Sequence, residues 1–167
     1  MTLTIACNSK TKKMDNEIQL VAFKIIGISI RTTNENGQSM TDMGKLWNRF
    51  YADSILPTIP NRINDDIYSV YTDYQSDYTG QYTAIIGCKV NSLDNIPRGL
   101  TGKQIQGGKY LKYVAKGKMP DAVVGRWKEI WNKDKELNRK YTADFEVYGL
   151  KSQNPDNAEV DIYIATE

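Results

Sequence analysis

The chain has 167 residues, enough to bury about 70% of its unfolded surface in one domain, or in two small fused halves, without a stabilising disulfide or metal. Its 22 basic and 20 acidic residues leave a net charge of +2, so neither nucleic acid nor an anionic membrane surface is the expected partner. The sequence has no histidine, which excludes Ser-His and Cys-His nucleophile pairs and most catalytic zinc sites.

Residues 1–16 are polar and aperiodic, which predicts a flexible leader ahead of a single domain at 17–167. Their apolar stretch, Leu3 to Cys7, is too short for a secretory signal or a membrane span. The second cysteine, Cys88, lies far from Cys7 and forms no metal-binding or redox motif with it. We therefore predict a cytoplasmic protein with reduced thiols, no cofactor, no metal and no membrane contact.

The first half of the domain, about 17–92, has the pattern strand, helix, strand, strand. Gln19 to Thr32 is rich in valine and isoleucine, which predicts a strand that bends at Gly27. The apolar stripe of the helix consists of Met40, Met43, Trp47 and Phe50. The two strands that follow are predicted at Asp66 to Asp73 and at Tyr82 to Val90.

The second half, about 100–167, repeats this order. Lys103 to Lys116 predicts a strand with a bend or bulge at Gly107-Gly108, and the charged run Lys133 to Lys140 predicts a solvated loop after the helix. The stripe of that helix consists of Val123, Val124, Trp127, Ile130 and Trp131. The last two predicted strands are Ala143 to Gly149 and Val160 to Ala165.

The repeated order predicts an α+β fold of duplicated βαββ halves around a pseudo-twofold axis. We expect an antiparallel sheet with the helices on one face and a ligand cleft on the other. In the register that aligns the halves, Ser69 corresponds to Glu146, and Gly87 corresponds to Tyr163. The repeat keeps its packing face and varies the other face, which is the asymmetry expected of a cleft that serves one ligand.

A carboxylate lies at the centre of the strand that begins at Ala143. Alternation puts Phe145 and Val147 on one face of this strand and Glu146 on the other. A buried carboxylate costs several kcal/mol unless it is paired, hydrated or protonated. An exposed acid at a sheet edge is one interpretation. The apolar neighbours favour the other, recognition of a small cationic and aromatic molecule, with a tyrosine hydroxyl or a water satisfying the acid while the pocket is empty.

Aromatic side chains are expected around Glu146. Tyr148 and Tyr163 are predicted on its face of the sheet, with Tyr71 opposite them from the first half. A cation against an aromatic face gains about 0.5 to 2 kcal/mol, so several rings and one carboxylate would form a cation site. The further candidate ligand contacts are Ser69, Trp127 and Tyr110. Packing in the core is the alternative for each ring, and for the tryptophans on helical stripes it is the favoured one.

Several runs of the sequence together resemble the stand-alone GyrI-like effector-binding domains, relatives of the ligand-binding modules of AraC-type and MerR-type regulators. These runs are DIYSVYTDY (Asp66 to Tyr74), YTAIIGCKV (Tyr82 to Val90), IPRG (Ile96 to Gly99), RWKEIW (Arg126 to Trp131), DFEVYG (Asp144 to Gly149) and VDIYIA (Val160 to Ala165). The resemblance covers about residues 18 to 166. It implies a duplicated βαββ fold, a ligand cleft between the halves, and a glutamate at the position of Glu146.

Both helices are needed to cover the sheet, so no separate helix-turn-helix is visible and no direct DNA binding is predicted. The predicted function is therefore binding of lipophilic or aromatic cationic effectors. The domain would act as a transcription-associated sensor that works with a separate regulatory protein, or it would sequester toxic compounds.

An enzyme is the alternative. A GyrI-like hydrolase of reactive electrophilic small molecules would use Glu146 as general base and Tyr148 or Tyr163 as proton donor. A third interpretation, an inhibitor of a topoisomerase, follows from the resemblance alone.

Overall fold

The computed structural model of the chain describes residues 16–167, so residues 1–15 of the predicted leader lie outside the described part. The elements of the first half are β1 (Glu17–Leu20), β2 (Phe23–Thr33), α1 (Gln38–Ala52), α2 (Ile55–Thr58), β3 (Arg62–Thr72) and β4 (Gln81–Val90). Those of the second half are β5 (Thr101–Ile105), β6 (Gly108–Gly117), α3 (Asp121–Asn132), β7 (Ala143–Tyr148) and β8 (Ala158–Ala165). Short 3-10 helices are η1 (Glu35–Gly37), η2 (Asp134–Glu136) and η3 (Leu150–Ser152).

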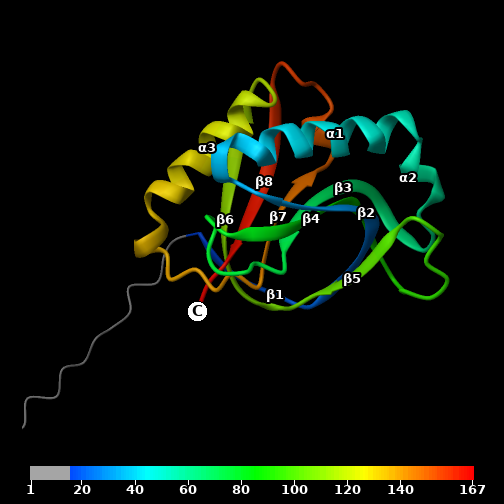
Figure 1. Cartoon of the computed structure of the whole chain (residues 1–167), viewed down its shortest axis with the longest axis horizontal. Helices are drawn as coiled ribbons and strands as arrows, with labels where there is room; N and C mark the ends of the chain where they lie inside the picture. The colour runs from blue at the N-terminus through cyan, green and yellow to red at the C-terminus, as the bar shows by residue number, and fades with distance from the viewer. Residues whose placement is uncertain (1–15) are drawn as a thin grey trace, which may run out of the picture.

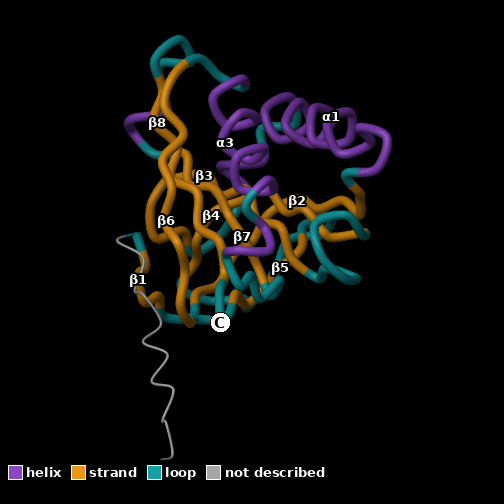
Figure 2. The backbone as a smooth tube through the Cα atoms, turned by 90° about the vertical axis from the view of Figure 1, so that its left-hand side faces the viewer, coloured by secondary structure: helices purple, strands orange, loops and turns teal. Residues whose placement is uncertain are grey.

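Within residues 16–167, eight strands form one sheet in the order β1-β6-β8-β7-β3-β4-β2-β5. Every strand pair in it is antiparallel. The helices α1 and α3 both lie over one face of the sheet, as Figures 1 and 2 show. The predicted α+β class with duplicated βαββ halves is confirmed. None of the helices in this part of the chain has the length and apolar character that crossing a membrane requires.

The two halves meet at the centre of the sheet, where β3 lies beside β7. Ser69 in β3 pairs directly with Glu146 in β7. The residue before Ser69 pairs with Gly87, and the residue before Glu146 pairs with Tyr163. The predicted register between the halves is therefore confirmed, and the pair in which serine replaces glutamate lies at the pseudo-twofold axis.

The halves exchange their first strands. β1 pairs with β6 of the second half, whereas β5 pairs with β2 of the first half. The predicted strand at Gln19 to Thr32 is consequently two strands, broken at 21–22, and the predicted strand at Lys103 to Lys116 is broken at 106–107. Alternation of apolar residues indicates a strand but does not reveal its partner, so the first break was not predicted.

Glycines permit close backbone approaches at two places in this arrangement. A Cβ added to Gly107 would lie 2.6 Å from the carbonyl oxygen of Leu20, because the two connections to the exchanged strands pass each other there. A bend was predicted at Gly27, and the strand is not broken there, since β2 pairs with β4 without interruption from Lys24 to Thr33. Gly27 instead faces Gly87, and a Cβ on either would lie 2.1 Å from a carbonyl oxygen of the opposite strand.

Buried apolar side chains form clusters on both faces of the sheet. One cluster under α1 includes Leu46 and Phe50, and another under α3 includes Trp127 and Ile130. The third cluster lies on the opposite face around Phe145 and receives side chains from both edge strands, β1 and β5. Side chains from both edges of a sheet can meet only if the sheet curls, so the curled sheet encloses this third cluster.

The prediction of a solvated loop at Lys133 to Lys140 is wrong for Arg139. Its side chain is 1% exposed, and its guanidinium donates to Asp144 at 2.6 Å and to Asp134 at 2.9 Å. Asp144 in β7 is fully buried and also accepts a hydrogen bond from the backbone of Ala165. The buried carboxylate of Asp144 needs a compensating charge, which explains why this arginine leaves solvent.

Gly87→Ala should destabilise the fold by about 3 kcal/mol, because the new methyl group forces β2 and β4 apart. Gly125→Ala in α3 is the matched control, since a Cβ there meets no atom within 4 Å. It should stabilise the helix by about 0.5–1 kcal/mol. Urea denaturation of both variants measures the difference, and equal stabilities would contradict the close approach described for Gly87.

Arg139→Met should cost about 3–5 kcal/mol of stability, because it leaves the Asp144 carboxylate buried without a counter-charge. Adding Asp144→Asn should recover part of the loss, since the amide carries no charge. Urea denaturation of the single and double variants tests this coupling. A double variant less stable than Arg139→Met would show that the arginine is not needed for charge compensation.

Candidate functional site

The carboxylate of Glu146 is buried and accepts hydrogen bonds from three neutral donors. Glu146 is only 1% exposed. Its Oε1 accepts from the indole Nε1 of Trp127 at 2.6 Å and from the hydroxyl of Tyr71 at 2.9 Å. Its Oε2 accepts from the hydroxyl of Tyr148 at 2.7 Å. We predicted that a tyrosine hydroxyl or a water satisfies this carboxylate while the pocket is empty. The first alternative is confirmed, with two tyrosine hydroxyls as donors.

Each donor reaches the carboxylate from a different element. Tyr148 lies two residues after Glu146 in β7, so strand alternation puts both on one face. Tyr71 comes from β3 in the first half, and Trp127 lies on the stripe of α3 that packs against the sheet. The hydroxyl of Ser69, which is fully buried, donates to the Tyr71 hydroxyl at 3.0 Å and leaves the Tyr71 proton for Glu146.

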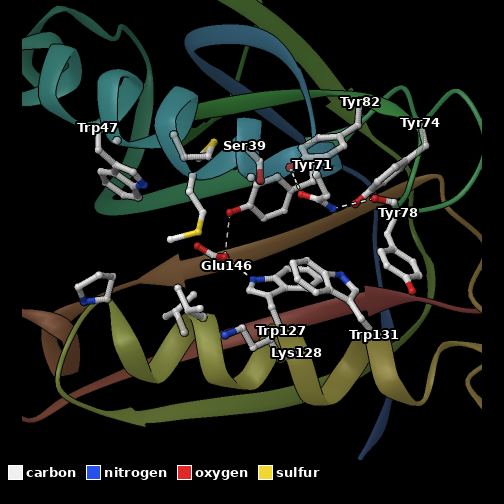
Figure 3. Close-up of a pocket in the computed structure, with 18 of the residues that line it drawn as sticks. Ser39, Trp47, Tyr71, Tyr74, Tyr78, Tyr82, Trp127, Lys128, Trp131 and Glu146 are labelled. Atoms are coloured by element: carbon white, nitrogen blue, oxygen red, sulfur yellow. Dashed lines mark hydrogen bonds between the residues drawn. The ribbon is translucent and has the colours of Figure 1, made fainter.

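A cavity of about 380 Å³ opens beside this carboxylate, between α1, α3 and the sheet (Figure 3). Most of its wall is aromatic or aliphatic. The aromatic residues are Trp47, Tyr71, Tyr74, Tyr78, Tyr82, Trp127, Trp131 and Tyr148. The other lining side chains include Met40, Met43, Val123, Val124, Asn34, Ser39, Lys128 and Glu146.

The cavity lies on the helix face of the sheet, so the prediction of a cleft on the face opposite the helices is wrong. Each helix covers its own half, which leaves a space between α1 and α3 above β3 and β7. The opposite face is closed because the sheet curls around the cluster that contains Phe145.

Burial controls the protonation of this site. It raises the pKa of Glu146, because removal from water disfavours the charged carboxylate. The hydrogen bonds oppose this effect, first that of Tyr148, then those of Trp127 and Tyr71. Burial also raises the pKa of the Tyr71 and Tyr148 phenols well above the usual value, so both remain protonated donors.

Asp144, the other acid on this face of β7, does not contribute free negative charge to the cavity. Its carboxylate is paired with Arg139 and accepts a hydrogen bond from the Tyr74 hydroxyl at 2.8 Å. Among residues 16–167, Glu146 has no such cationic partner, because its three donors are neutral. The uncompensated charge at the cavity therefore comes from Glu146.

Four candidate residues from the sequence, Glu146, Tyr148, Tyr71 and Trp127, line the cavity together. Ser69 lies behind Tyr71 and acts on the site through the Tyr71 hydroxyl.

The structure does not bring Tyr163 or Tyr110 to this site. Tyr163 pairs with Phe145 across β7 and β8, and their rings stack with centroids 4.7 Å apart. Tyr110 also contacts Phe145, and its hydroxyl donates to the backbone of Gln106 at 2.9 Å. Cross-strand partners share a face, so Tyr163 lies with Phe145 and not with Glu146. The prediction that Tyr163 shares the face of Glu146 is wrong.

Several cavity residues were not predicted from the sequence. Trp47 and Trp131 were assigned to the core, because a helical stripe does not distinguish a side chain in a core from one at a cavity. Trp47 meets the ring of Tyr148 edge-on at 5.0 Å, and Trp131 stacks on Tyr78 at 5.6 Å. Tyr78 comes from the turn between β3 and β4, where no periodicity indicates the direction of a side chain.

Tyr148→Phe should raise the pKa of Glu146 further, because it removes the hydrogen bond that most strongly opposes burial. The phenylalanine ring can keep the edge-on contact with Trp47. Tyr71→Phe, which removes a weaker opposing bond, should have a smaller effect in the same direction. A ¹³C NMR titration of the Glu146 side-chain carbonyl measures both.

The same pKa predicts how stability depends on pH. A carboxyl group with a raised pKa in the fold stabilises it at low pH and loses this contribution as the pH rises through the folded value. The ligand-free protein should therefore lose stability relative to Glu146→Gln as the pH rises above 4.5, the ordinary value for glutamate. A Glu146 that titrates below 4.5 would contradict the assignment.

Known proteins with similar sequences share this arrangement of strands. Residues 18–166 match the family described as Cass2, integron-associated effector binding protein. The structure of the integron cassette protein VCH_CASS2 from the mobile metagenome of Vibrio cholerae is similar, with 30% sequence identity and a TM-score of 0.69. The alignment covers 91% of this chain and 95% of the cassette protein.

Two further relatives extend the comparison. The structure of SAV2435 bound to tetraphenylphosphonium is 18% identical with a TM-score of 0.75, covers 90% of this chain and 92% of SAV2435, and shows the shared fold. The Bacillus subtilis protein YobU, whose name suggests a transcriptional regulator, is 28% identical over 147 residues. That alignment covers 85% of this chain and 91% of YobU.

Proposed function

This chain belongs to the Cass2 family of integron-associated effector-binding proteins, and from that premise we propose that it binds lipophilic or aromatic cations beside Glu146. The family membership confirms the resemblance to effector-binding domains of the GyrI-like fold. The class of ligand is the proposal, with Glu146, Tyr71, Tyr148 and Trp127 as its direct contacts. Ser69 would support the site through Tyr71.

The observation that carries the proposal is a buried carboxylate in an aromatic cavity, with no cationic partner in the part of the chain that the structure describes. Its three donors are neutral, so they hold the Glu146 carboxylate in place without cancelling its charge. A charge acts strongly at short range where water is excluded. Aromatic faces attract cations as well. The wall thus favours a ligand that has a positive charge and large apolar surfaces.

The size of the cavity and one related structure support this class of ligand. A volume of about 380 Å³ lies within the range of about 300–1,000 Å³ for small-molecule pockets. SAV2435, which shares the fold, was solved with tetraphenylphosphonium, a cation surrounded by four phenyl rings. We infer that this chain accepts compounds of the same chemical type.

The biological role we propose is that of a sensor or a sequestering protein. The name of YobU supports a role connected with transcription. Within residues 16–167, both helices over the sheet contribute to the wall of the cavity. We propose that a sensor of this kind acts through a separate regulatory protein.

The alternative of a hydrolase is not favoured by the geometry. A carboxylate has about four acceptor positions, and donors already occupy three of them on Glu146, which leaves little capacity to activate a water. The proposed proton donor Tyr148 already donates to Glu146, and Tyr163 lies on the opposite face of the sheet. The arrangement is better suited to stabilising a bound cation.

Glu146→Gln tests the proposal with tetraphenylphosphonium as the ligand. We expect wild-type protein to bind the cation and the variant to lose at least about ten-fold in affinity, equivalent to about 1.4 kcal/mol. The fold should survive, since the amide oxygen can still accept from Tyr71 and Trp127, and the Tyr148 hydroxyl can rotate to accept from the amide. Isothermal titration calorimetry measures the affinity, with Glu136→Gln as an exposed control outside the cavity.

The pH dependence provides a second readout of the same experiment. Only the ionised carboxylate attracts a cation, so affinity should fall as the pH is lowered through the raised pKa of Glu146. The variant should lack this dependence. Equal binding of neutral triphenylphosphine oxide, or unchanged affinity in Glu146→Gln, would contradict the proposal. Hydrolysis of an electrophilic substrate that Glu146→Gln abolishes would support the enzyme instead.

A further inference from the structure

Two opposite charges line the cavity at different depths. Among the described residues of the wall, Glu146 is the one acid and Lys128 is the one base. Glu146 is buried beneath its three donors, whereas Lys128 is exposed on α3, directly after Trp127 (Figure 3). A ligand that fills the cavity would therefore meet a negative charge inside and a positive charge at the rim.

Lys128 is available to a ligand. Within residues 16–167, it has no carboxylate at salt-bridge distance, although Arg126 on the same helix is paired with Glu129. Apart from Glu146, the other polar side chains of the described wall, such as Asn34 and Ser39, are neutral. They cannot compensate the charge of the lysine. The flexible stem of a lysine lets its ammonium group follow an acceptor over several ångströms.

We propose that the preferred effectors are aromatic zwitterions, which carry a cationic centre for Glu146 and a carboxylate, or a similar anionic group, for Lys128. This inference rests on the proposed cation site and specifies its ligand further. A simple cation would be repelled by Lys128, whereas an anionic substituent at the outer end of the ligand converts that repulsion into attraction. The two charges would also orient the ligand, with its cationic end inward.

A matched pair of probes tests this directly. (4-Carboxybenzyl)triphenylphosphonium is a zwitterion at neutral pH, and its methyl ester has the same rings and phosphonium without the negative charge. Calorimetry with both probes on wild-type protein and on Lys128→Met gives a two-by-two cycle. The methionine keeps the apolar stem of the lysine and removes only the charge. Lys133→Met, directly after the end of the same helix and outside the cavity, controls for the change in net charge.

We expect wild-type protein to bind the zwitterion at least as tightly as the ester. In Lys128→Met, the ratio of zwitterion affinity to ester affinity should fall about three-fold, the size typical of an exposed ion pair. Lys128→Glu should reverse the preference and bind the ester more tightly than wild-type protein does. Lys133→Met should leave the ratio unchanged.

Two outcomes would overturn the inference. If Lys128→Met raises the affinity for both probes equally, the lysine only repels positive charge and does not contact the carboxylate of the zwitterion. If the ratio is unchanged in every variant, the anionic group of the ligand does not reach Lys128. In both cases, loss of both probes in Glu146→Gln would still support the cation site, whereas probes that bind independently of Glu146 would contradict the proposed function itself.

Discussion

Across the described residues 16–167, the site depends on one carboxylate that is held by neutral donors and not by a counter-charge. Two phenols and an indole satisfy the oxygens of Glu146, so the side chain can stay buried in the absence of a ligand. Had an arginine served the same purpose, the charge would have been cancelled, as it is at Asp144 two residues earlier in the strand. The two acids on one face of β7 thus differ, since Asp144 belongs to a structural ion pair and Glu146 belongs to the proposed binding site.

The pseudo-twofold arrangement explains where the asymmetry of the site arises. Ser69 and Glu146 face each other at the axis, so one substitution between equivalent positions places a single acid at the centre of the molecule. Tyr71 and Tyr148 follow them by two residues in their strands, and both donate to the same carboxylate. The serine lacks a charge and supports one of these tyrosines. The two halves thus form a symmetric frame, in which one ionisable residue distinguishes the second half from the first.

Strand alternation predicted the central part of this site from the sequence. It identified Glu146 with Tyr148, and the alignment of the two halves placed Ser69 and Tyr71 correctly. It failed for Tyr163, because alternation assigns a face only within one strand, while the face of a neighbouring strand depends on the register between them. The buried Arg139 and the turn residue Tyr78 were missed because no periodic pattern exists in irregular segments. The exchange of edge strands was also missed, since it depends on pairing between distant parts of the chain.

That exchange makes the two halves mutually dependent. β1 completes the sheet of the second half and β5 completes that of the first, so each half on its own would have an unpaired strand edge. Separate unfolding of one half would break strand pairs in both, which ties the whole sheet into one cooperative unit. Both walls of the cavity belong to that unit. A molecule that binds between them would therefore protect the entire sheet against unfolding, including the edge strands that it never touches.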